Sequence, residues 1–137
     1  MIIFNYETDF TIDNEDILSN WIHNCILSEG FEVGEINYIF CDDAYLLKLN
    51  IEFLQHDTLT DIISFDNTMG KLISGDIFIS VERVAENAKI FDVSFDDELH
   101  RVMIHGVLHY LGYKDKTDNE KKAMRNKENQ SLFNLIY

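Results

Sequence analysis

Two helix-start signals and one helix-stop signal punctuate the last third of the chain. Ser94 is followed by Asp97, an acidic variant of the capping box, and Thr117 is followed by Glu120, which matches the box directly. Gly112 stands between them, where a helix that begins after Ser94 needs a left-handed residue to end. The sequence therefore predicts a long helix over 95–111, a turn and a terminal helix.

Short apolar runs alternate with helical patterns in the rest of the chain. Further helices are predicted from Asn14 to a cap at Gly30, after the capping residue Asp42, and over 80–91. A polar, glycine-containing turn over 67–75 joins the last two predicted strands. The four predicted strands lie over 2–7, 36–41, 62–65 and 76–80. About four strands interspersed with about five helices favour helices packed on a mixed sheet.

Length and composition suit one folded domain over 1–137. The 137 residues are 46% hydrophobic, which excludes intrinsic disorder and supplies a core. Cys25 and Cys41 lie in apolar stretches and are expected in that core rather than in a disulfide framework. The N-terminus lacks the basic region of a signal peptide, and no apolar run approaches a membrane span. A cytoplasmic location with no membrane partner is therefore predicted.

The formal net charge of −14 argues, as a total, against a protein that binds nucleic acid by neutralising phosphates. Its distribution changes that argument. Residues 1–70 hold 14 acidic residues and one basic residue, whereas residues 71–137 hold 11 acidic and ten basic residues. Six basic residues form either the solvated face of the terminal helix or a local anion-facing patch: Lys114, Lys116, Lys121, Lys122, Arg125 and Lys127.

Two of the five histidines, His105 and His109, lie four residues apart in the predicted helix and therefore project from one face. After the stop at Gly112 the chain can turn back and bring the Asp115 carboxylate to the same point. Two nitrogens and one oxygen leave a fourth position for water, as in catalytic zinc sites. A metal ion there lowers the pKa of its water to about 7 and so supplies a nucleophile.

Each part of this pattern, taken alone, also has a purely structural interpretation. The histidine pair by itself is compatible with two hydrogen-bonded core residues, and Asp115 by itself with a helix cap or a loop. The glycine and the carboxylate at matching distances favour the metal site. Of the remaining histidines, His23 and His100 are expected on the surface and His56 in a loop over 55–60.

The ligand spacing matches the pattern of the metzincin metalloproteases. Those enzymes carry glutamate directly after the first histidine, as the general base for the attacking water, whereas this chain has Gly106. A protease is therefore the second choice.

The stretch from His105 to Tyr113 resembles the signature of the YbeY family, bacterial endoribonucleases of rRNA maturation. The resemblance spans 49–128, with the matching blocks in the same order. These are Leu49-Asn50, Asp57-x-x-Thr60-Asp61-Ile62-Ile63-Ser64-Phe65, Gly75-Asp76-Ile77-Phe78-Ile79-Ser80, and then Met124 and Glu128.

The resemblance implies a zincin-like α+β domain with one bound divalent metal, expected to be Zn²⁺, and hydrolysis of single-stranded RNA. It implies a role in maturing the 3′ end of small-subunit rRNA, with rRNA, the ribosomal subunit and ribosomal or assembly-factor proteins as partners. It assigns His105 and His109 as metal ligands. Asp115 stands where the commonest third ligand of the family is histidine; a carboxylate is a competent, harder ligand.

A second departure is Leu54, where many family members carry an arginine for RNA contact or catalysis. Leucine cannot hold a phosphate. Either Lys114 or Lys116 substitutes, or the activity is weaker than in relatives with the arginine. In the block over 60–65 the apolar residues Ile62, Ile63 and Phe65 are expected as strand core, and the polar residues are candidates to bind substrate: Thr60, Asp61 and Ser64.

We therefore expect a metal-dependent endoribonuclease in which His105, His109 and Asp115 hold the metal that activates water. Two alternatives stay open: a zincin-type metalloprotease, and a non-catalytic ribosome-assembly factor with a structural metal. The acidic first half predicts weak affinity for free RNA and recognition that depends on the metal cleft and the ribosomal context.

Overall fold

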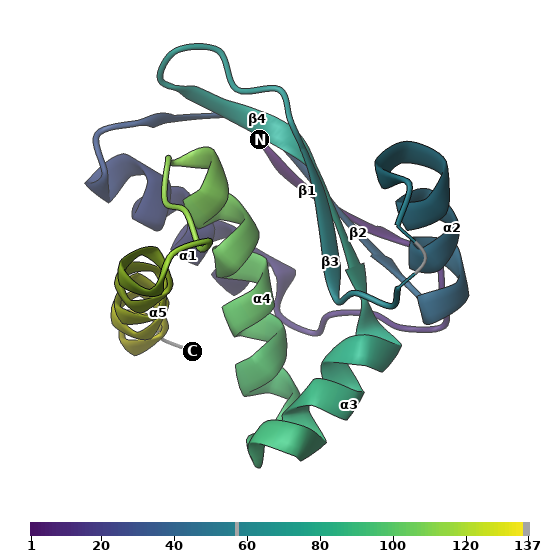
Figure 1. Ribbon diagram of the computed structural model, residues 1–137. Helices are drawn as coiled ribbons and strands as arrows, with labels where there is room; N and C mark the ends of the chain where they lie inside the picture. Colours follow the sequence, from purple (N-terminus) through teal and green to yellow (C-terminus); the bar gives the residue numbers. More distant parts are fainter. Residues whose placement is uncertain (57, 136–137) are drawn as a thin grey trace.

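The computed structural model describes residues 1–56 and 58–135, arranged in layers around one mixed sheet (Figure 1). Asp57, part of the second matching block, lies outside this range. In the order β1-β2-β4-β3, the first three strands run parallel and β3 lies antiparallel at the edge. The four strands of the described residues are β1 (Ile2–Tyr6), β2 (Glu32–Cys41), β3 (Ile62–Asp66) and β4 (Leu72–Ser80).

Helices cover both faces of the sheet. The described residues form five: α1 (Glu15–Ser28), α2 (Asp43–Leu54), α3 (Val81–Phe91), α4 (Phe95–Tyr110) and α5 (Asp118–Phe133). α1 and α4 lie on one face, α2 lies on the other, and α5 packs against α4 rather than on the sheet (Figure 1). The predicted α+β class, with four strands and five helices, is confirmed.

The main core fills the space between the sheet and the layer of α1 and α4. Alternate residues of β4, including Ile77 and Ile79, are fully buried there, together with Ile22 of α1 and Met103 of α4. A smaller cluster of Cys41, Leu46 and Ile63 lies under α2. The face under α2 is mixed, because it also carries Asn37 and Asp76, whose side chains share a hydrogen bond of 3.0 Å. Each large aliphatic side chain buried here contributes about 1.5–3 kcal/mol.

Two strands are longer than predicted. β2 begins at Glu32 instead of 36 and β4 begins at Leu72 instead of 76, so the turn predicted over 67–75 is shorter. Glu32 pairs with Leu72 and Val33 with Ile73, and the register shifts between Val33 and Ile36. Pairing with a distant strand extends these segments, so local periodicity could not predict their length.

The predicted surface position of His100 is wrong, because the residue is buried. Its exposed fraction is 4%, and its ring meets Trp21 edge-on with the centroids 6.2 Å apart. The reason is that the start of α4 packs against α1, and this burial lowers the pKa of His100. His23 is exposed as predicted, and His56 lies in the loop after α2 as predicted. Among the described residues, no helix is long and apolar enough to cross a membrane.

Candidate metal centre

The C-terminal end of α4 makes the chain turn back on itself. Gly112 has a φ of +103°, which glycine adopts without a steric penalty. The amide of Gly112 donates to the carbonyl of His109 and the amide of Tyr113 donates to the carbonyl of Leu108, both at 3.0 Å. These two bonds form the Schellman motif, so the predicted stop at Gly112 is confirmed.

The segment after Gly112 is anchored at both ends. The Tyr113 hydroxyl donates to Oε1 of Glu29 at 2.5 Å, and Lys127 of α5 pairs with the same oxygen at 3.2 Å. Burial and the bond to Glu29 raise the pKa of Tyr113 to about 12, so its hydroxyl stays a donor. The predicted capping box at Thr117 then starts α5. The backbone that carries Asp115 is therefore held between two fixed points.

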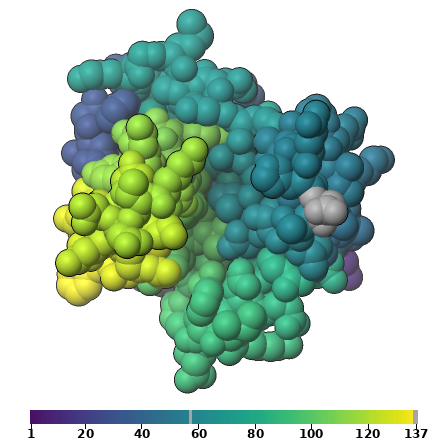
Figure 2. Space-filling view, in the orientation of Figure 1, coloured from purple at the N-terminus to yellow at the C-terminus, as the bar shows by residue number. Residues whose placement is uncertain are grey.

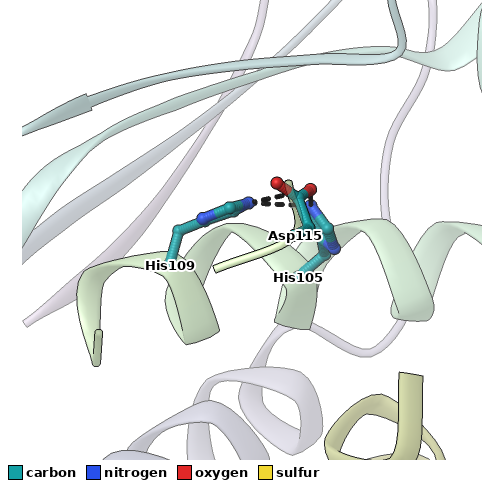
Figure 3. A group of neighbouring side chains, drawn as sticks. All are labelled: His105, His109 and Asp115. Carbon is teal, nitrogen blue, oxygen red and sulfur yellow. Dashed lines mark hydrogen bonds and ion pairs between the residues drawn. The ribbon is translucent and has the colours of Figure 1, made fainter. Parts of the chain in front are cut away.

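His105, His109 and Asp115 converge on one point (Figure 3). Nε2 of His105 lies 3.1 Å from Nε2 of His109, and each nitrogen lies 3.3 Å from Oδ2 of Asp115. Ligand atoms at 2.0–2.1 Å from a tetrahedral zinc ion stand about 3.3 Å apart. The three donors thus match three corners of such a site, and all three side chains are partly exposed to solvent.

Glu128 of α5 holds His105 from the side opposite the shared point. Its Oε2 lies 2.7 Å from Nδ1 of His105, its Oε1 accepts from Nη1 of Arg101 at 2.9 Å, and the residue is 4% exposed. A carboxylate in this position keeps the proton on Nδ1 and leaves the Nε2 lone pair for a metal ion.

Burial and hydrogen bonding act in opposite directions on this pair. Burial alone lowers the pKa of His105 and raises that of Glu128, but their hydrogen bond and opposite charges outweigh it, so the pKa of His105 is raised and that of Glu128 is lowered. In the sequence, Glu128 is notable only as part of a block that matches the family. Its spacing from Met124 predicts a shared buried face, but no local signal identifies the histidine that it contacts.

A pocket of about 280 Å³ opens beside His105, between α3, α4, α5 and the start of β3. Figure 2 shows the surface hollowed between the yellow-green segment that enters α5 and the teal segment of α2 and β3. Besides His105, the polar side chains that line the pocket are Asp61, Asn87, Glu98, Arg101, Arg125 and Glu128.

Of the predicted substrate-binding residues, Asp61 alone lines this pocket. Burial raises the pKa of its carboxyl. The Thr60 hydroxyl donates to the carbonyl of Ile62 within its own segment, and Ser64 is exposed on the edge strand.

The basic cluster predicted over 114–127 is divided in the structure. Lys114 and Lys116 are exposed on either side of Asp115 and do not line the pocket, whereas Arg125 does. Lys127 pairs with Glu29. Leu54 lies at the end of α2 and is 46% exposed.

Gly106 faces the sheet rather than the point on which His105, His109 and Asp115 converge. A Cβ there would lie 3.1 Å from Cδ1 of Ile62 and 3.1 Å from Cδ1 of Ile77. The position that carries the general base in metzincins therefore has no room for a glutamate side chain, because α4 packs closely on the sheet at this point.

Related proteins resemble this chain over nearly all of its length. The family model described as Endoribonuclease YbeY matches residues 3–135. A protein of Flavobacterium johnsoniae named Endoribonuclease YbeY is 61% identical over 132 residues, which cover 96% of this chain and 95% of the relative. A protein of Christiangramia forsetii with the same name is 54% identical over 131 residues, covering 96% and 92%.

A solved structure resembles it as well. The solution structure of TM1509 from Thermotoga maritima matches with a TM-score of 0.69 at 28% identity, and the match covers 96% of this chain and 87% of that one. The motif resemblance, the matched residues and the shared fold agree, and the chain belongs to the YbeY family.

Proposed function

We propose that this protein is a zinc-dependent endoribonuclease that cleaves single-stranded RNA. One observation carries the proposal: three donor atoms converge at 3.1–3.3 Å in a chain whose relatives are named endoribonucleases. As a single domain over 1–137, the protein would act in the cytoplasm on the 3′ end of small-subunit rRNA, in contact with the ribosomal subunit and its proteins.

His105, His109 and Asp115 would hold the ion, because two imidazole nitrogens and one carboxylate oxygen form a donor set that zinc accepts. When bound, zinc lowers the pKa of its water and polarises a phosphoryl oxygen. The protein's own residues prepare this chemistry. Glu128 orients the imidazole of His105. Arg101 balances the charge of Glu128 in the interior.

The family favours the endoribonuclease over both alternatives from the sequence. A metalloprotease of the metzincin type needs a glutamate where Gly106 packs against Ile62 and Ile77. An assembly factor with a structural metal would have its ligands closed off, whereas the side chains of His109 and Asp115 are 33% and 41% exposed.

The test combines metal analysis with cleavage. We expect protein purified without chelator to contain about one zinc ion per chain, and to cut unstructured single-stranded RNA but not an unfolded protein substrate. His109→Ala removes the zinc and the cleavage. His23→Ala, which removes an exposed histidine of α1, changes neither.

Three results would overturn the proposal. These are the absence of bound metal at neutral pH, cleavage of protein instead of RNA, and normal rRNA ends in cells that carry only a folded His109→Ala protein.

A further inference from the structure

The pocket beside His105 contains two guanidinium groups with different surroundings. Nη1 of Arg101 donates to Oε1 of Glu128 and Nη2 donates to Oδ1 of Asn129, both at 2.9 Å, and the side chain is 23% exposed. Both terminal nitrogens of Arg101 therefore already donate hydrogen bonds within the protein.

Arg125 is held far more loosely. Its side chain is 57% exposed, and its Nη1 lies 3.6 Å from Oε1 of Glu128, beyond hydrogen-bond distance. That oxygen already accepts from Arg101 at 2.9 Å. Within residues 1–56 and 58–135, no hydrogen bond uses the donors of Arg125. The charge of Arg125 therefore lies within ion-pair range of Glu128, but its five N–H donors remain available to a ligand of the pocket.

The charges around Arg125 favour an anionic ligand at the mouth. Lys121 and Lys122 precede it by one helical turn on α5 and are exposed, which extends the positive charge along the helix. The pocket also contains three carboxyl groups, of which Glu98 and Glu128 are buried. Glu128 is paired with Arg101 and His105, and burial raises the pKa of Asp61 and of Glu98.

The anion that suits a guanidinium best is one with two oxygens in a plane, such as a phosphodiester. We infer that Arg125 binds a backbone phosphate of the RNA strand whose scissile phosphate lies at His105, His109 and Asp115. This assignment rests on the proposed function. It also specifies the path of the bound RNA, which crosses α5 at Arg125.

The test measures RNA binding in a chain that does not cleave. A labelled single-stranded oligonucleotide is titrated with protein carrying His109→Ala, at several salt concentrations. Adding Arg125→Gln is expected to weaken binding roughly tenfold, as for a lost hydrogen bond to a charged group. It should also reduce the slope of log K against log salt by about 0.7, the value for one phosphate of a single strand.

Two further variants separate a phosphate contact from a general loss of charge. Arg125→Lys keeps the charge and loses the planar fork, so the slope is retained while affinity falls. Lys89→Gln removes one exposed positive charge from α3 that does not line the pocket, and it should leave both affinity and slope unchanged. In the cleaving chain, Arg125→Gln raises KM about tenfold with little change in kcat.

Equal effects of Arg125→Gln and Lys89→Gln would overturn the inference. Absence of binding when Arg125 is intact would also overturn it, because the contact does not need the metal. Failure of the proposed function is a different result, since it appears as no RNA cleavage by the unmodified, zinc-loaded chain.

Discussion

At the scale of single residues, the geometry of the candidate metal centre depends on Glu128. This buried carboxylate lies 2.7 Å from Nδ1 of His105 and sets which nitrogen carries the proton. We expect Glu128→Gln to lower zinc affinity by roughly 10–100-fold, because an amide binds the Nδ1 proton less strongly. Competition with a chromogenic chelator measures the affinity. Glu98→Gln, at the other buried glutamate of the pocket, is the matched control. Equal losses from the two variants would contradict a specific role for Glu128.

At the scale of elements, Asp43 connects α2 to the junction of β4 and α3. It accepts a hydrogen bond from Oγ of Ser80 at 2.7 Å and one from Nη2 of Arg83 at 2.9 Å. Burial raises the pKa of the Asp43 carboxyl, but the bonds from Arg83 and Ser80 outweigh burial, so its pKa lies below the usual value.

A carboxyl group with a lowered pKa in the folded state stabilises the protein above its unfolded pKa of about 3.9, and this contribution is lost as pH falls through the folded pKa. Asp43→Asn is therefore expected to lower the free energy of unfolding by about 1 kcal/mol at neutral pH. Urea unfolding of both proteins should show a constant difference from about pH 8 to pH 5 that shrinks below about pH 4. A difference that grows on acidification would refute this assignment.

At the scale of the whole molecule, the predicted metal connects two segments that are separate in the sequence. Two of the candidate ligands come from α4, and the third comes from the loop that leads to α5. Because only the folded chain brings them together, zinc at one hundred times its Kd should add about 2.7 kcal/mol of stability. The melting temperature should then rise by roughly 5–10 °C.

Differential scanning calorimetry with zinc and with chelator measures this effect. The control is His109→Ala, which should melt at one temperature under both conditions. An equal zinc response in the two proteins would mean that the ion binds elsewhere.

What the sequence by itself determined was local. Helix starts at Ser94 and Thr117 and the stop at Gly112 were predictable, because caps act through hydrogen bonds between near neighbours. The grouping of His105, His109 and Asp115 follows from those signals, since one helical turn and one reversal bring the three together.

Tertiary structure decided whatever depends on residues far apart in the chain. The added lengths of β2 and β4 come from their pairing, and the burial of His100 comes from packing against α1. Glu128 meets His105 only because α5 lies on α4, and the same packing places Arg125 at the mouth of the pocket. Periodicity predicts which face of a helix is buried, but it carries no information about the side chain on the other element, and that contact sets the chemistry.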